Sequence, residues 1–189
     1  MYLYLQIWGG GFYLLNKILF SVAETREAQV KRSLKMAGWI IFILGMPPWL
    51  IILLGNNNWI IAATEVGAIP AMFLGLYNTY HNYNKTAPKL FTSFVTFCTY
   101  FFIAVGLTYS IYVHGGITTV TQMLEVAVIT GFLLGSYFLA QNNSIGWLFF
   151  ILMNISTAIL MFIHDKPILM AQQLVSLGFV IYGYVHSRD

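Results

Sequence analysis

One stretch of this chain occurs twice in the same direction. Residues 146–152 (GWLFFIL) correspond to residues 38–44 (GWIIFIL) at an offset of 108 residues, and the same offset places Gly75 on Gly183. An internal repeat constrains architecture more than any local pattern, because each copy is expected to form the same supersecondary unit. The chain is therefore expected to contain two copies of one module.

The composition indicates the solvent of these modules. Of 189 residues, 59% are hydrophobic and only 8% are charged, whereas soluble domains contain about 25% charged residues. A water-facing globule of this size cannot hide so much apolar surface. We therefore expect an all-α polytopic membrane protein, because helices satisfy their own backbone hydrogen bonds in lipid. The net charge of +3 is not a nucleic-acid signal here, and its distribution along the chain is a topology signal instead.

The apolar segments predict about seven transmembrane helices of about 20 residues each. The first segment lacks a basic start, which favours a retained helix over a cleaved signal peptide. Glycines 9–11 are expected to break this helix, and the charged connector 24–35 is expected to lie on the membrane surface. Turns are expected at residues 56–58 and 114–116. The helices are expected at about residues 2–20, 36–54, 59–81, 90–113, 122–141, 146–164 and 168–186.

Lysine and arginine are distributed unequally between the two expected sides. The positive-inside rule then places the N-terminus outside and the C-terminus in the cytoplasm. The membrane itself is expected to be the cell (inner) membrane. Lys17 is expected near the inner end of the first helix. The expected inner side carries Arg26, Lys31, Arg32, Lys35, Lys85, Lys89 and Arg188, whereas the outer side carries only Lys166.

The repeat and the span count together predict the domain plan. Residues 1–84 form a first three-helix unit, residues 85–116 form a linker helix, and residues 117–189 form a second unit. A single linker helix makes the two units parallel in the membrane. Parallel repeats are a known transporter plan, with the site between the halves.

Residues 125–188 resemble the C-terminal three-helix unit of PnuC-type vitamin transporters, the nicotinamide riboside transporter family. The resemblance is carried by the Glu125-opened helix, the aromatic stretch 137–144, Asn154 in a Trp-led helix, Gln172-Gln173, and the Tyr182-Gly183-Tyr184 end. The three-plus-one-plus-three order also resembles the SWEET sugar transporters. The resemblance implies facilitated diffusion of a small vitamin-like nucleoside or base, driven by phosphorylation of the substrate inside the cell.

Polar side chains within the spans are the candidate substrate-binding residues, because such groups normally face the bundle interior or a water-filled path. Asn154 offers a donor and an acceptor to a neutral heterocycle or a ribose. Gln173 aligns with Glu65 in the repeat, which favours a facing pair near the axis between the units. Gln172 is a weaker candidate for substrate binding than Gln173. Interhelical packing is the alternative role for each of these side chains.

Trp49 and Tyr137 are candidates for stacking on a flat ring, with a lipid-facing role as the alternative. Pro47, Pro48 and Pro70 lie inside spans, where they are expected to kink helices near a site or hinge.

The sequence disfavours several classes of protein function. Enzyme motifs are absent from the sequence, so no catalytic residue, metal ligand or cofactor is predicted. The expected partners are a small-molecule substrate and the lipid bilayer, without nucleic acid, and a homo-oligomer is left open. Two alternatives to a vitamin transporter remain: a non-transporting membrane scaffold or assembly subunit, and a SWEET-like sugar carrier.

Overall fold

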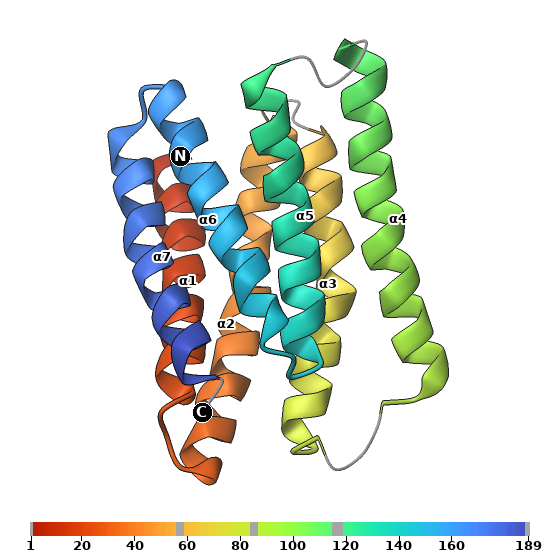
Figure 1. Cartoon of the computed structure of the whole chain (residues 1–189), viewed down its shortest axis with the longest axis vertical. Coiled ribbons are helices and arrows are strands. Elements are labelled where there is room, and N and C mark those ends of the chain that lie inside the picture. Colours follow the sequence, from red (N-terminus) through yellow and green to blue (C-terminus); the bar gives the residue numbers. More distant parts are fainter. Residues whose placement is uncertain (1, 56–58, 84–86, 115–118, 188–189) are drawn as a thin grey trace.

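The computed structural model describes residues 2–55, 59–83, 87–114 and 119–187, and over these residues the chain is entirely helical (Figure 1). The first helix starts and the last helix ends toward opposite ends of the bundle (Figure 1). The seven helices are α1 (Tyr2–Ala23), α2 (Ala28–Gly55), α3 (Trp59–Tyr80), α4 (Lys89–His114), α5 (Val120–Ala140), α6 (Ile145–Ile163) and α7 (Pro167–His186).

Among the described residues, five helices contain segments that are long and apolar enough to cross a membrane. Their outward faces carry large exposed apolar side chains such as Phe97, Phe162 and Ile168, as expected of surfaces that meet lipid. The helices α1 and α3 have 22 residues each and carry the ionisable residues Lys17 and Glu65. The five candidate spans are Ala28–Ile51, Lys89–Tyr109, Val120–Ala140, Ile145–Ile163 and Pro167–His186.

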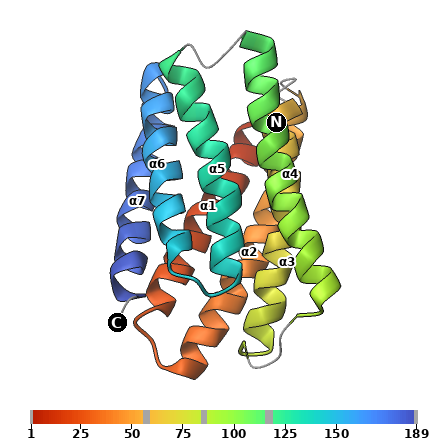
Figure 2. The ribbon, with the colours of Figure 1, turned by 45° about the vertical axis from the view of Figure 1, so that its right-hand side comes forward.

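Six of the helices form a closed ring. Going around it, α1 packs on α2, α2 on α3, α3 on α5, α5 on α6, α6 on α7, and α7 returns to α1. The helix α4 lies outside this ring against α3 and α5, at the edge of the bundle (Figures 1 and 2). The helix α4 therefore contacts only two of the six helices of the ring among the described residues.

The expected helix boundaries are confirmed to within a few residues for α3 to α7. The expected break at Gly9–Gly11 is wrong, because α1 runs through all three glycines. Their small size serves packing instead. A Cβ at Gly9 would approach Trp49 Nε1 of α2 to 2.9 Å, and one at Gly10 would approach Gln172 Nε2 of α7 to 2.9 Å.

The expected surface connector is also wrong in its second half. Helix α2 already begins at Ala28 and continues through Pro47 and Pro48 to Gly55. Lys35 is buried, with an exposed fraction of 8%, because its ammonium reaches the Glu24 carboxylate. The expected turn at residues 56–58, the glycines at 115 and 116, Lys85 and Arg188 lie outside the described residues.

Candidate functional site

Aromatic rings from four helices meet inside the ring of helices. Tyr13 of α1 stacks on Phe132 of α5 with ring centres 6.0 Å apart, and it contacts Phe42 of α2 edge-on at 5.2 Å. Phe42 also meets Phe132 edge-on at 6.0 Å. Phe150 of α6 is fully buried in the same core. This aromatic layer, Tyr13, Phe42, Phe132 and Phe150, joins helices that are distant in sequence.

Lys17 projects into the aromatic layer. Its side chain is fully buried, with an exposed fraction of 0%. Its Nζ lies 3.1 Å from the centre of the Phe150 ring, 5.0 Å from Phe42 and 5.3 Å from Tyr13. No hydrogen-bond partner in the described structure reaches that nitrogen. Lys17 was expected to be a topology charge at a helix end, and its complete burial corrects that interpretation.

The contacts of Lys17 with the aromatic rings do not fully offset the cost of burying its ammonium. A desolvated cation over an aromatic face gains about 2 kcal/mol, whereas bringing an ammonium into a protein interior costs several kcal/mol even after relaxation. The rings offset much of this cost but leave the donors of the ammonium unused. A polar group that offers an acceptor would complete the site.

Glu65 is the candidate carboxylate partner of Lys17. It lies on α3, and its Oε2 is buried without a hydrogen-bond partner in the described part of the chain. The two ion pairs found among the described residues both belong to Glu24. Lys17 and Glu65 therefore form no ion pair with each other among the described residues.

Asn154 is fully buried in α6, as expected for a site residue. Its Nδ2 donates to the Phe150 carbonyl at 2.7 Å, whereas its Oδ1 has no partner in the described structure. On α1, the Nδ2 of Asn16 donates to the Gly38 carbonyl of α2 at 3.0 Å, and its Oδ1 also has no partner among the described residues. Asn16 thus links α1 to α2, whereas Asn154 bonds within its own helix, and both leave their amide oxygen unused.

The two glutamines of α7 have different surroundings. Gln172 donates from Nε2 to the Gly10 carbonyl of α1 at 2.9 Å, so it ties α7 to α1 across the ring closure. Gln173 is half-buried and its helix lies opposite α3 in the ring. No hydrogen bond joins Gln173 to Glu65 in the described part of the chain, so the sequence-derived pairing stays a prediction.

The two aromatic candidates contact neighbouring helices. Trp49 packs on Gly9 of α1, and its Nε1 is buried without a partner within the described ranges. The hydroxyl of Tyr137 on α5 shares a hydrogen bond of 2.9 Å with Thr96 of α4. Tyr137 thus links α4 to the ring. Among the described hydrogen bonds of the predicted substrate-binding residues, that of Asn154 is the one that reaches a residue of the aromatic layer, Phe150.

The repeat-related tryptophans occupy equivalent contacts. A Cβ added to Gly75 of α3 would come within 2.2 Å of Trp39 of α2, and one added to Gly183 of α7 would come within 2.6 Å of Trp147 of α6. Both indole N–H groups are buried without partners among the residues that the structure describes. The two indoles also line one small hollow, together with Phe20, Glu24, Lys35, Tyr83 and Leu139.

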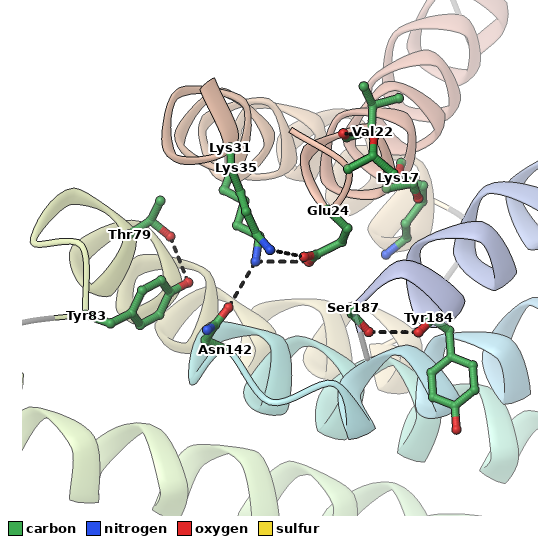
Figure 3. A network of polar contacts seen from close by, with 12 residues as sticks. Lys17, Val22, Glu24, Lys31, Lys35, Thr79, Tyr83, Asn142, Tyr184 and Ser187 are labelled. Atoms are coloured by element: carbon green, nitrogen blue, oxygen red, sulfur yellow. Dashed lines mark hydrogen bonds and ion pairs between the residues drawn. The ribbon is translucent and has the colours of Figure 1, made fainter. Parts of the chain in front are cut away.

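A polar cluster closes this end of the bundle (Figure 3). The Glu24 carboxylate pairs with Lys31 at 2.6 Å and with Lys35 at 3.0 Å. Lys35 Nζ also donates to Asn142 Oδ1, at the turn between α5 and α6, at 3.0 Å. We call Glu24, Lys31, Lys35 and Asn142 the Glu24 cluster. It connects the start of α2 to the α5–α6 turn.

Two further hydrogen bonds join separate parts of the ring at the same end. Asn78 Nδ2 of α3 donates to the Ala140 carbonyl of α5 at 2.9 Å. Ser21 Oγ of α1 donates to the Phe179 carbonyl of α7 at 2.5 Å. With the Glu24 cluster, these bonds hold α1–α3 against α5–α7 at the end that carries most of the basic residues.

Lys17 is the site residue that the sequence reasoning missed. The available signal was a lysine inside an apolar helix, preceded by Asn16 and six residues before the helix end at Ala23. Such a position also fits an interfacial charge that extends its amine to water. Among the described residues, no three His, Cys, Asp or Glu side chains gather to hold a metal.

Taken together, these features define an all-helical bundle with several helices able to cross a membrane and with unpartnered polar groups in its core. Comparisons with protein-family models, with curated proteins and with solved structures find no match for this chain.

Proposed function

We propose that this protein is a membrane transporter that moves a small vitamin-like nucleoside or base by facilitated diffusion and alternating access. The observation that carries the proposal is the buried ammonium of Lys17, which lies between Phe42 and Phe150. These two phenylalanines are equivalent in the repeat. A group flanked by equivalent side chains lies near the axis that relates the repeats, where parallel-repeat transporters bind substrate.

The packing order of the helices supports a parallel repeat of α1–α3 and α5–α7 across seven spans. Exchanging α1 with α5, α2 with α6 and α3 with α7 reproduces every contact in the ring. The contacts of Trp39 with Gly75 and of Trp147 with Gly183 follow the same exchange. In this arrangement the two units are rigid bodies that rock about their shared aromatic layer.

The Glu24 cluster supports alternating access. It holds the two units together at the basic end, which the positive-inside rule places in the cytoplasm. The hollow between Trp39 and Trp147 lies directly at this closure. Release of solute toward the cytoplasm would require the contacts from Lys35 to Asn142 and from Asn78 to Ala140 to separate.

The thermal stability of the purified protein tests this function. Nicotinamide riboside, thiamine, riboflavin and simple sugars are added at increasing concentration, and a specific ligand raises the unfolding temperature further as its concentration rises above its dissociation constant. The substitution Asn154→Ala is expected to remove the shift. Thr99→Val is the matched control, because Thr99 is equally buried and bonds the carbonyl four residues back, but it lies on α4.

The outcomes separate the candidate functions. A shift with a vitamin and none with sugars supports the proposal, whereas a shift with sugars alone supports a SWEET-like carrier. The absence of a shift with every solute would contradict transport and favour a scaffold subunit, in which Asn154 and Glu65 are packing groups.

A further inference from the structure

The amine of Lys17 and the carboxyl of Glu65, which can carry opposite charges, are held apart in the core. Lys17 Nζ and Glu65 Oε2 both lack hydrogen-bond partners among the described residues. They belong to α1 and α3, which are separated by α2 in the ring of helices. A charge in a protein interior is stable only when it is paired and hydrogen-bonded. Each of the two groups therefore has hydrogen-bonding capacity that the described residues do not use.

A solute that binds between Lys17 and Glu65 must satisfy both groups together. The Lys17 ammonium has only donors, so it requires an acceptor oxygen or nitrogen. An ionised Glu65 carboxylate has only acceptors, so it requires a donor or a positive charge. A solute with a single positive charge would be repelled by Lys17, and a solute with a single negative charge would be repelled by Glu65.

The surroundings of Lys17 restrict the shape of the solute. Tyr13, Phe42 and Phe150 present ring faces or edges around the ammonium. Aromatic side chains bind flat rings by stacking or by edge contacts. A planar ring with polar groups at its two ends matches both the aromatic layer and the separated charges.

We infer that Lys17 and Glu65 hold the two ends of a small zwitterionic ring solute, with its carboxylate on Lys17 Nζ and its positive end toward Glu65. This inference rests on the proposed transport function and specifies the charge pattern of the transported solute. It assigns to Lys17 a substrate contact rather than a purely structural contact with Phe150.

Four pyridines of nearly equal size provide the test. They are nicotinamide (neutral), nicotinate (negative), 1-methylnicotinamide (positive) and 1-methylnicotinate (zwitterionic), and their affinities for the purified protein are measured by titration calorimetry. We expect 1-methylnicotinate to bind most tightly. We expect Lys17→Met to weaken its binding by about tenfold or more, the effect of losing one hydrogen bond to a charged group.

The variants identify which charge recognises which end. In Lys17→Met, 1-methylnicotinamide is expected to lose no affinity, so the preference for the carboxylate disappears. In Glu65→Gln, 1-methylnicotinate and nicotinate are expected to become equal. Lys17→Arg should retain the carboxylate preference and serves if Lys17→Met does not fold. Lys166→Met, at an exposed turn, is the matched control and should leave all four affinities unchanged.

Several results would overturn the inference. One is tightest binding of 1-methylnicotinamide, and another is an unchanged affinity ratio in Lys17→Met, as a purely structural cation–ring contact would give. Binding of a sugar or another vitamin without any of the pyridines would overturn the inference while leaving transport intact. Binding of no solute at all would overturn both.

Discussion

The contact between Trp147 and Gly183 gives the sharpest test of the packing between α6 and α7. In Gly183→Ala, the new Cβ would lie 2.6, 2.8 and 2.9 Å from three atoms of the Trp147 ring, compared with 3.4–4 Å in ordinary contacts. Trp147 has an exposed fraction of 1%, so its ring has little room to move. Overpacking of this kind costs about 1–3 kcal/mol.

A matched control on the same helix isolates that cost. Gly178 has no atom within 4 Å of its added Cβ. Both substitutions replace glycine by alanine in α7, and each therefore gains the same helix propensity, about 1 kcal/mol in water. The difference between the two variants is the packing term alone. We expect Gly183→Ala to be less stable than Gly178→Ala by about 1–3 kcal/mol.

Denaturant unfolding in detergent micelles, followed by tryptophan fluorescence and circular dichroism, measures both variants. Trp147→Phe in the Gly183→Ala background should recover part of the loss, because the smaller ring leaves room for the methyl group. Equal stability of Gly183→Ala and Gly178→Ala would refute the close packing of Trp147 on α7. Gly75→Ala should be the more severe change, since its Cβ would lie 2.2 Å from Trp39.

Two further predictions concern the end of the bundle that carries the Glu24 cluster. Lys35→Met removes the bonds to Glu24 and Asn142 and should lower the free energy of unfolding by about 1–3 kcal/mol. In this variant, a cysteine introduced at Leu139 in a Cys98→Ser background should react faster with a thiol reagent. The control Lys89→Met should change neither the stability nor the reaction rate. Burial raises the pKa of the Tyr83 phenol above its ordinary value of 10.0, the hydrogen bond with Thr79 lowers it in part, and the charge of Glu24 raises it. The neutral phenol therefore stabilises the fold below about pH 10, and this contribution is lost as the pH rises through the folded-state pKa. Alkaline unfolding curves should be flatter for Tyr83→Phe than for wild type or for Tyr80→Phe, and equal curves would contradict the assignment.

The ring of helices also explains the unusual glycines and prolines of the first half. Gly9 and Gly10 let Trp49 and Gln172 approach the backbone of α1, and Gln172 uses this approach to bond the Gly10 carbonyl. Pro48 is buried within α2, whereas Pro47 faces outward. Residues that interrupt isolated helices are thus used here at contacts between helices.

The amino-acid sequence by itself determined the all-helical class, the positions of α3 to α7 and the apolar character of the spans. These properties follow from local composition, because a segment of apolar residues in lipid must satisfy its own backbone. The sequence also contained the equivalence of Trp39 with Trp147 and of Gly75 with Gly183. Only the tertiary structure decided that each tryptophan packs on the glycine of its own repeat.

The tertiary structure alone also decided the fate of the polar residues. Nothing local distinguishes Lys17, which points into the aromatic layer, from a lysine that extends to the membrane surface. Its burial depends on Phe150, a residue far along the chain, and Lys35 is buried for the same kind of reason, because Glu24 and Asn142 reach it. Contacts between distant segments determine which of these polar side chains face the core, so the sequence of one helix alone does not predict it.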